Sequence, residues 1–496
     1  METALKQGPG TAGLKGSLGK AGLALVVACA AAMPPAWAAG EEEESSPSLG
    51  RWERVRVKME ARGELFAPTG DDSGEVRRPF NAAARLDFLE AVAEANPAEA
   101  VAAAPPRDAR GVRHFFSAAS ELSLDRDGDA RRSLAPATTT LVVASSPTVT
   151  HFAPDALLTR EESELLAIAF DPLLLDQLLP PADSASAEWR PSGELVAALL
   201  VIDTVGRPVD DQKADPTGDS PDPAAAGPLL ARVEPAADSE GSAKLLVTGT
   251  VHGAVDGVPT TIRVDGSYEL DAAGRRIKSG VVRLREKRLA GHVSPGFECE
   301  ASFQMARRPA EGSQAVPAAD AAVLSGMEAA WARVLDGQRT APRRSLRFQD
   351  PDRRFALIHD ARWRAVADDA RGLVLRMVDD GALLAECTVL PLPPGEAGMS
   401  IEAFRRDIER SLAGRLDRFT ASEEQPSAES AGRALRVVSE GTVDGVPLEW
   451  RHYLVEDGRG SRTAVTFTVE RRFADRFGRA DADFMAGLNP KTGPAP

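Results

Sequence analysis

The chain has 496 residues, 43% of them hydrophobic, and a net charge of −15 at pH 7. This length is too great for one ordinary hydrophobic core and predicts two or three domains. The acidic balance argues against a nucleic-acid partner, because phosphate binding requires clustered Lys and Arg.

The N-terminus has the three parts of a secretory signal peptide. Lys6, Lys15 and Lys20 precede the apolar run Ala21–Ala32, and the small-residue site Ala36-Trp37-Ala38 follows it. The run is shorter than the about 20 residues that a membrane-spanning helix needs. We therefore assign residues 1–38 to a signal peptide, expect an exported protein that is periplasmic or extracellular, and expect no transmembrane helix in the mature chain.

A second interpretation of this segment is a lipid anchor. Val26-Val27-Ala28-Cys29 resembles a bacterial lipobox, in which Cys29 would become the lipidated first residue. Cleavage after Ala38 without lipid is preferred, because Ala36-Trp37-Ala38 is placed for removal of the whole segment. The acidic residues that follow predict a disordered segment over 39–50.

Residues 51–308 alternate between apolar and polar side chains, which predicts an antiparallel β-rich domain. The clearest run is Arg51–Phe66, where Val55, Val57 and Met59 alternate with charged residues. Further strands are expected at 82–88, 112–124, 138–149, 194–205, 229–234, 243–251, 258–270, 280–288 and 297–307.

Helical signals interrupt this sheet. Thr159 and Glu162 form a capping box, and Asp171-Pro172 has the residues of an N-cap and a first helical position. We therefore expect a helical insertion. Residues 206–227 are dense in Asp, Pro and Ala and are predicted to be disordered, because they have too little apolar surface to bury.

One five-residue string occurs twice. Val255-Asp256-Gly257-Val258-Pro259 and Val443-Asp444-Gly445-Val446-Pro447 each join two alternating apolar runs. Asp-Gly between such runs is the strongest short-range hairpin signal, because both turn residues must adopt positive φ. We expect each copy to be the central hairpin of a separate antiparallel sheet.

Residues 309–344 are predicted to be a linker, in which Asp320–Leu335 has apolar residues at helical spacing and is expected to form a bridging helix. Residues 345–488 form the second predicted domain, and 489–496 are assigned to a disordered tail. In that domain Ser400 caps a helix that runs to about Leu416. Strands are expected at 355–359, 373–378, 382–390, 435–443, 448–455 and 463–470, and a last helix at 481–488.

The second domain resembles the PsbP-like superfamily in the order of its elements. Phe355–His359 enters with Trp363 nearby, an amphipathic helix carries Phe404, and a three-strand meander and a C-terminal helix follow. The resemblance implies an α/β/α sandwich with an antiparallel sheet over about Leu346–Leu488, in a superfamily of assembly and interaction proteins without a shared active site. The whole chain is also similar to uncharacterised secreted proteins of the planctomycete kind.

The expected fold class is therefore α+β. A large antiparallel sheet with a helical insertion, which can also be interpreted as a half-barrel, is followed by the smaller α/β/α sandwich. The large sheet with its helical plug resembles the half-barrel of lipoprotein carriers, and that resemblance implies an apolar ligand.

The sequence contains no motif that gathers reactive side chains. Cys-x-x-Cys, His-Glu-x-x-His, nucleophile-elbow and phosphate-loop patterns are absent. We assign no catalytic, cofactor-binding or metal-ligating residue, expect no cofactor, and predict that the chain is not an enzyme. The six histidines are isolated in sequence: His114, His151, His252, His292, His359 and His452.

Two histidines have neighbours that could suggest chemistry. His452 shares a strand face with Leu448 and Trp450, which favours a core histidine. His359 adjoins Asp360, but adjacent strand residues point to opposite faces, so the two cannot form an acid/base pair.

Three other features receive structural interpretations. Asp125–Asp129 is interpreted as a solvated turn rather than a calcium loop, because Ala130 and Pro136 stand where an EF-hand needs Gly and Glu. Cys299 and Cys387 are interpreted as buried thiols rather than an interdomain disulfide. The basic run Arg283–Arg288 is interpreted as a solvent face or a charged sheet edge.

The function expected from these observations is that of an exported, non-catalytic two-domain binding or scaffold protein of the cell envelope, with an unknown protein or apolar ligand as partner. The alternative is a carrier that holds a lipid or other apolar ligand in the first domain. A second alternative is an unrecognised secreted hydrolase, because sites assembled from distant loops leave no linear pattern. A meeting of His114, His151, His252 and His292 with carboxylates in one pocket would favour the hydrolase.

Overall fold

The computed structural model describes residues 49–68, 75–93, 110–124, 128–145, 148–180, 188–205, 229–235, 243–271, 276–310, 321–335, 345–369, 371–393, 398–426, 433–456 and 461–490. These residues form two compact units, which divide between Arg343 and Arg344. The predicted signal peptide 1–38, the acidic residues up to 48 and the insertion 206–227 lie outside the described residues. Leu49 and Gly50 already belong to the first strand.

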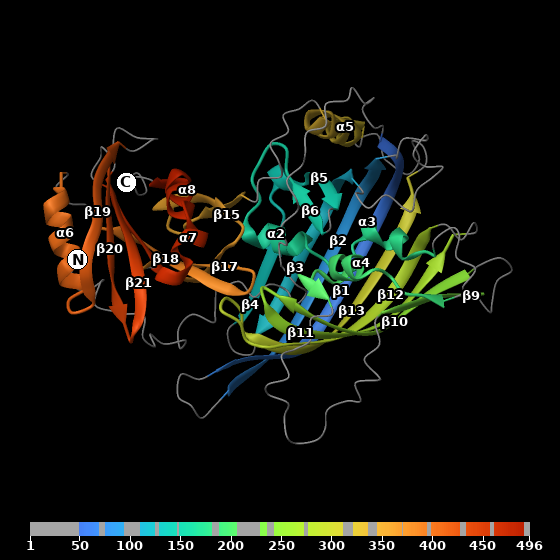
Figure 1. Ribbon diagram of the computed structural model, residues 1–496. Helices are drawn as coiled ribbons and strands as arrows, with labels where there is room; N and C mark the ends of the chain where they lie inside the picture. The colour runs from blue at the N-terminus through green and yellow to red at the C-terminus, as the bar shows by residue number, and fades with distance from the viewer. Residues whose placement is uncertain are drawn as a thin grey trace, which may run out of the picture. The chain divides into compact units, whose positions relative to one another are not determined.

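The first unit is built on one thirteen-stranded antiparallel sheet (Figure 1). Its path runs β6-β5-β3-β2-β1-β13-β12-β11-β10-β9-β7, with β4 beside β3 and β8 beside β10, so the sheet is open at β6 and β7. The strands are β1 Leu49–Pro68, β2 Glu75–Ala93, β3 Arg110–Leu124, β4 Gly128–Ser133, β5 Thr140–Ser145, β6 Val149–Phe152, β7 Glu188–Trp189, β8 Thr204–Val205, β9 Leu230–Pro235, β10 Ala243–Val255, β11 Val258–Leu270, β12 Ile277–Arg288 and β13 Gly296–Pro309.

Alternation decides which face each side chain of this sheet occupies. In β1, Val57 and Met59 are buried on the inner face, while Arg56 and Glu60 are exposed on the outer face. β1 pairs with β2 on one side and with β13 on the other, in continuous register from Glu53 opposite Pro309 to Phe66 opposite Gly296. The first and last long strands of the unit therefore lie side by side in the middle of the sheet.

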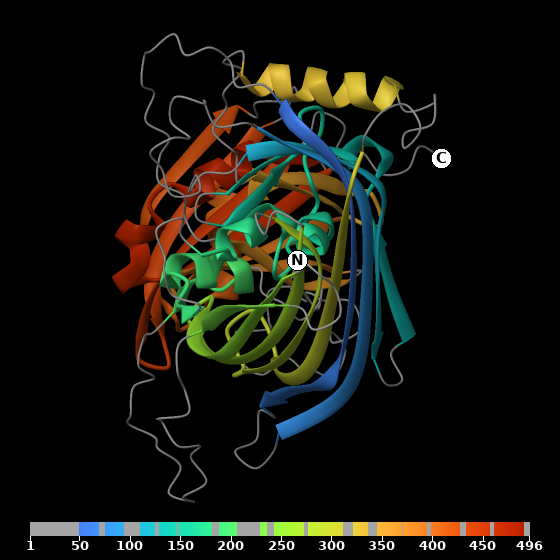
Figure 2. The same ribbon diagram turned by 90° about the vertical axis from the view of Figure 1, so that its right-hand side faces the viewer.

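The predicted helical insertion lies on the inner face of the curved sheet (Figures 1 and 2). It comprises α2 Arg160–Leu166, α3 Pro172–Leu175, the 3-10 turn Asp176–Leu178 and α4 Gly193–Leu200. The capping box at Thr159 and the cap at Asp171 are both confirmed. Phe170 packs near Tyr268 of β11, with ring centroids 6.4 Å apart.

Two strand predictions for this unit were wrong in part. Residues 194–205 form helix α4 before the short β8, because Ser192 caps the helix and accepts a hydrogen bond from the Leu195 amide. The run that follows is apolar throughout and has no period of two. Residues 138–149 contain the last residue of the 3-10 turn Pro136–Thr138, then β5 and the first residue of β6, rather than one strand. Strand β4 was not predicted.

The predicted bridging helix packs on the first unit. It is α5, Ala321–Leu335, and its Met327, Ala330 and Trp331 are buried in one cluster with side chains of β2, β3 and β5. The strand side chains of that cluster are Leu89, Ala91, Val112 and Val142. Since Glu90 and Arg113 alternate with them and point to the other face, this end of the sheet is buried on both sides.

The second unit contains a seven-stranded antiparallel sheet of order β16-β17-β18-β22-β21-β20-β19 and a small sheet of order β14-β15-β23. Its elements are β14 Ser345–Gln349, β15 Phe355–Asp360, β16 Trp363–Asp369, β17 Gly372–Asp379, β18 Ala382–Leu392, α6 Ile401–Ser411, β19 Leu416–Pro426, β20 Arg433–Val443, β21 Val446–Glu456, β22 Arg462–Glu470, the 3-10 turn Arg471–Phe473, α7 Ala474–Phe477, α8 Ala480–Ala486 and β23 Leu488–Pro490. Both units are mostly β.

Each face of the seven-stranded sheet has its own core. Phe404 and Ile408 of α6 pack with Trp450 of β21 on one face. On the other face an aromatic cluster of Trp363, Phe467, Phe477 and Phe484 joins β16 and β22 to α7 and α8. The second unit is therefore layered, with helices on both faces of the sheet.

Three predictions for the second unit need correction. Helix α6 ends at Ser411 rather than near Leu416, and the chain turns at Gly414, whose φ is +77°, before β19 begins. β14, β16 and β19 were not predicted as strands. The assigned disordered tail begins too early, because Asn489 and Pro490 pair with β15 in β23.

Both repeated turns form the predicted hairpins. Val255 lies opposite Val258, with φ of +47° at Asp256 and +73° at Gly257. The second copy repeats this geometry, with φ of +49° at Asp444 and +80° at Gly445. Positive φ at both central residues is the type I′ signature that the string predicts.

Candidate functional site

A cluster of buried charged side chains lies beneath the helical insertion of the first unit. Arg113 of β3 is 1% exposed. Its Nε donates to Glu90 Oε1 of β2 at 2.7 Å, and its Nη1 and Nη2 donate to Asp171 Oδ2 and Oδ1 at 2.9 and 2.5 Å. Nη1 also lies 3.1 Å from His151 Nε2 of β6. One guanidinium thus joins two strands to the N-cap of α3.

The Arg113 cluster, which comprises Arg113, Glu90, Asp171 and His151, has shifted pKa values with clear causes. Burial alone would lower the pKa of Arg113, but the carboxylates of Asp171 and Glu90 outweigh burial and raise it. Burial would raise the pKa of Asp171, but the charge and hydrogen bonds of Arg113 hold it below its usual value. Burial and the neighbouring guanidinium lower the pKa of His151 to about 3.

These directions define what the cluster can do chemically. His151 is neutral at neutral pH and contacts the guanidinium of Arg113 rather than a carboxylate. Asp171 is held ionised and also accepts the Leu173 amide at 2.8 Å. Arg113 thus ties the N-cap of α3 to β2 and β3 through charge-assisted hydrogen bonds.

Further ion pairs repeat this arrangement around the insertion. Asp176 accepts from Arg307 of β13 at 2.9 Å and lies 3.4 Å from Arg276. Glu164 of α2 accepts from Arg132 of β4 at 3.2 Å. The pair of Asp171 with Arg113 follows the same rule. In all of these pairs the acid belongs to the insertion, and the arginine belongs to the sheet or to the turn that flanks it. These contacts reach from β3 and β4 to β12 and β13 and fix the insertion across the inner face.

The other histidines of the first unit stand apart from the Arg113 cluster. His114 Nδ1 lies 2.8 Å from Thr140 Oγ1, and His252 Nδ1 lies 3.2 Å from Thr261 Oγ1. His292 is exposed in the turn before β13. Of the four histidines singled out in the sequence, His151 contacts the buried guanidinium of Arg113.

The histidine beside an aspartate behaves as strand alternation requires. His359 is 6% exposed and its Nδ1 lies 2.9 Å from the backbone oxygen of Asp360. The Asp360 carboxylate instead accepts the Arg362 amide at 2.8 Å. The imidazole of His359 and the carboxylate of Asp360 thus have different hydrogen-bond partners in these two contacts.

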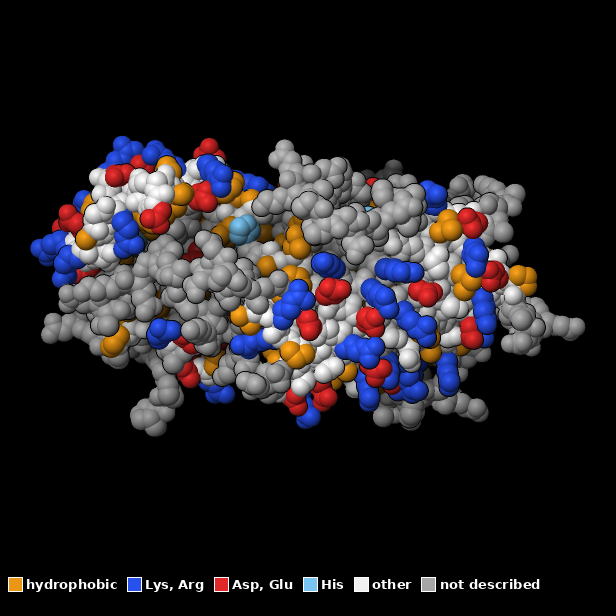
Figure 3. All heavy atoms as spheres, turned by 90° about the horizontal axis from the view of Figure 1, so that it is seen from below, with side chains coloured by type: hydrophobic (Ala, Val, Ile, Leu, Met, Phe, Trp, Pro, Cys, Tyr) orange, Lys and Arg blue, Asp and Glu red, His pale blue; other side chains and the backbone are white. Residues whose placement is uncertain are grey.

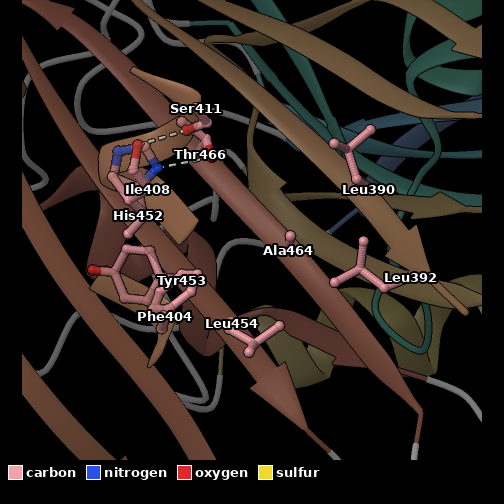
Figure 4. A pocket seen from close by; sticks show the side chains of 10 residues that line it. All are labelled: Leu390, Leu392, Phe404, Ile408, Ser411, His452, Tyr453, Leu454, Ala464 and Thr466. Atoms are coloured by element: carbon pink, nitrogen blue, oxygen red, sulfur yellow. Dashed lines mark hydrogen bonds between the residues drawn. The ribbon is translucent and has the colours of Figure 1, made fainter. Parts of the chain in front are cut away.

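A small pocket in the second unit lies between α6 and the sheet (Figure 4). It has a volume of about 30 Å³, room for one water molecule. Two polar residues of its lining have shifted pKa values: burial lowers the pKa of His452 to about 4, and burial with the neighbouring Asp481 raises that of Tyr453. The Nδ1 of His452 lies 3.3 Å from Thr466 Oγ1, while Phe404, Ile408 and Leu454 supply apolar walls. With no carboxylate in the lining, His452 is the core histidine that the sequence predicts.

The remaining chemical candidates are accounted for locally. Among the described residues no three metal-ligating side chains converge. Of the predicted turn Asp125–Asp129, residues 125–127 lie outside the described residues, and Asp129 lies in β4. Cys299 and Cys387 are buried free thiols, as predicted, and burial raises the pKa of each. None of the described helices is both long and apolar enough to cross a membrane.

Comparisons with known proteins add similarities of structure only. The sequence matches no protein-family description and no curated protein. A Bacteroides thetaiotaomicron protein of solved structure is 12% identical over 29% of this chain and 48% of its own, with a TM-score of 0.22, so this chain spans about half its length. PsbP of Synechocystis sp. PCC 6803 is 9% identical over 31% of this chain and 96% of its own, with a TM-score of 0.24. Lipovitellin is 9% identical over 53% of this chain and 26% of its own, with a TM-score of 0.24.

The Arg113 cluster was not found from the sequence. Its members come from four elements, and Arg113 is 23 residues from Glu90 and 58 from Asp171. One local signal existed, because Arg113 follows Val112 at the start of a run predicted as a half-buried strand. Arg113 is buried because the insertion covers the inner face, and the run itself does not show which segment covers it.

Proposed function

We propose that this chain is an exported, non-catalytic binding or scaffold protein of the cell envelope. The main observation behind this proposal is that the buried charged residues of the first unit form structural ion pairs. In these pairs, acids of the insertion contact arginines of the sheet. Export is supported by the signal pattern of 1–38. The layered second unit, with α6 on one face and α7 and α8 on the other, supports its interpretation as a PsbP-like α/β/α sandwich of the kind found in assembly proteins.

The protonation states explain why these charges support a binding role. A general acid or base works best when its pKa lies near the operating pH. In the Arg113 cluster the pKa of Asp171 is held below its usual value and that of His151 is about 3, so both stay in one state at neutral pH. Such groups hold the insertion in place and do not exchange protons with a substrate.

A panel of ester, glycoside, peptide and phosphate substrates tests the proposal on the purified full chain. We expect no turnover above that of buffer. Turnover that His151→Gln, Asp171→Asn or His452→Gln abolishes, while exposed His292→Gln preserves it, would contradict the proposal and favour the hydrolase.

The mass of the secreted N-terminus tests export. We expect a mature chain that starts at Ala39. A mature chain that starts at a lipid-bearing Cys29 would instead show that the protein is lipid-anchored. Retention of the whole segment in the cytoplasm would contradict export. Native mass spectrometry tests the carrier alternative, because a co-purified lipid would assign the inner face of the first sheet to an apolar ligand.

A further inference from the structure

Six strands of the thirteen-stranded sheet, β1, β2, β10, β11, β12 and β13, have an outer face whose charge is opposite in sign to that of the whole chain. Among their outward side chains that the structure describes, twelve are Lys or Arg and seven are Asp or Glu, a surplus of five positive charges on a chain of net charge −15. The basic residues are Arg54, Arg56, Lys58, Arg62, Arg77, Arg85, Lys244, Arg263, Arg283, Arg285, Lys287 and Arg308, and the acids are Glu60, Glu64, Asp87, Asp265, Glu269, Glu298 and Glu300. Figure 3 shows Lys and Arg side chains gathered over one face of the molecule.

Several of these cations have no ionic partner in the described part of the chain. Arg62 and Arg285 share Glu300, at 3.1 and 2.9 Å. Exposed Arg85, Arg263, Arg283 and Lys287 form no such salt bridge. Asp265 lies opposite Arg283 in the strand register, and Glu298 lies opposite Lys287, but neither pair forms a salt bridge. Exposed cations on adjacent strands are therefore left to meet an external anion.

The register of the strands adds an independent observation. Three pairs of like positive charge lie directly opposite one another: Arg263 and Arg285, Lys58 and Arg85, and Arg54 and Arg308. On the same face, two acids lie directly opposite one another in one pair, Glu64 and Glu298. Like charges placed directly opposite in a sheet destabilise it. One member of each pair has a carboxylate partner, namely Glu300 for Arg285, Glu60 for Lys58 and Asp87 for Arg54. An anion over the face would relieve the repulsion that remains.

We propose that the outer face centred on Arg263, Arg283, Arg285 and Lys287, here called the basic patch, docks on an anionic phospholipid membrane. The membrane location rests on the proposed envelope function. The patch occupies neighbouring strands about 4.8 Å apart, so its charges are spread over a surface rather than aimed at one point. An array of phosphate head groups matches that spread, whereas a single small anion needs converging donors.

Co-sedimentation of the purified full chain with vesicles tests the proposal. The probes are vesicles of phosphatidylglycerol with phosphatidylcholine and vesicles of phosphatidylcholine alone. We expect binding only to the anionic vesicles and a steep loss of binding with added salt. Each cation near an anionic surface contributes about fivefold in affinity, so reversing three of them by Arg263→Glu, Arg283→Glu and Lys287→Glu lowers binding at least about a hundredfold.

A matched control changes the net charge equally elsewhere. Arg347→Glu, Arg406→Glu and Arg479→Glu lie on exposed positions of the second unit and are expected to leave vesicle binding within about twofold of the wild type. Circular dichroism of both triple variants keeps loss of binding distinct from loss of fold.

Three outcomes would overturn the proposal. The wild type does not bind anionic vesicles, the patch variant and its control lose binding equally, or soluble polyphosphate or a DNA duplex binds the patch while vesicles do not. These outcomes are independent of the turnover and export measurements, so failure of membrane docking is distinguishable from failure of the proposed function.

Discussion

The two units share a hairpin string but stabilise their interiors by different means. Beneath the insertion of the first unit, Arg113 is buried between Glu90 and Asp171, and polar contacts fix the position of the helices. In the second unit the aromatic cluster holds α7 and α8 through ring contacts, with centroids 5.3–6.2 Å apart.

The difference separates two tasks that buried side chains perform. The insertion consists of short helices joined by irregular chain, and directional ion pairs can specify one placement for it on a wide sheet. The aromatic rings fill volume between layers whose placement the strands already set. We therefore expect the first unit to be sensitive to single charge changes and the second unit to be sensitive to lost side-chain volume.

The largest effect is expected for Arg113→Met. Removing the guanidinium leaves Glu90 and Asp171 buried without a counter-charge and costs about 3–5 kcal/mol in the free energy of unfolding of the first unit. Hydrogen exchange of peptides from β2, β3 and α3 measures this loss of stability. Adding Glu90→Gln and Asp171→Asn to Arg113→Met is expected to restore part of the loss. A triple variant less stable than the single one would contradict this account.

In the second unit the corresponding change is Phe467→Ala. It opens a cavity among Trp363, Phe477 and Phe484 and costs about 3–4 kcal/mol. Denaturant unfolding followed by hydrogen exchange of β22 measures the loss. Phe116→Ala is the control, because Phe116 is 41% exposed and its loss should cost under about 1 kcal/mol. Equal losses in the two variants would contradict the cluster's role.

Acid is expected to act on the second unit through His452. The unfolded chain takes up a proton near pH 6.5, whereas burial lowers the pKa of folded His452 to about 4. The stabilisation is therefore complete above the unfolded value and is lost as the pH falls towards 4. Between about pH 7 and about pH 5, protonation of His452 in the unfolded chain lowers the free energy of unfolding by roughly 1–2 kcal/mol.

Urea unfolding at a series of pH values checks this acid dependence. His452→Gln should flatten the curve over that range, and half-buried His252→Gln on the first unit should leave the curve of the second unit unchanged. An unchanged slope in His452→Gln would show that the imidazole is not the titrating group.

The smallest effects concern the shared turn. Gly257 and Gly445 have φ of +73° and +80°, where a Cβ costs about 1–2 kcal/mol. Gly257→Ala and Gly445→Ala are expected to destabilise their own units by similar amounts in thermal unfolding. Gly326→Ala in α5, where an added Cβ meets nothing within 4 Å, should stabilise by about 0.5–1 kcal/mol instead. A large inequality between the two turns would show that the string has different roles in the two sheets.

The helix caps and hairpin turns were predicted correctly because they depend on interactions between residues close together in the sequence. Thr159, Asp171 and both Asp-Gly turns act within a few residues, so their patterns predict caps and hairpins. The run 193–200 was misassigned because its apolar residues fit a buried strand as well as a helix. The Arg113 cluster and the basic patch depend on strands that meet only in the folded sheet, and no local pattern specifies those meetings.

The pairing of β1 with β13 constrains how the first unit is made. Glu53 lies opposite Pro309, so the strand synthesised first waits for one that emerges about 250 residues later. Closing so long a loop slows folding, and β1 keeps an unpaired edge in the meantime. We therefore expect β1 to lack its β13 partner until residue 309 has been synthesised, and the first unit to depend on chaperones until that strand arrives.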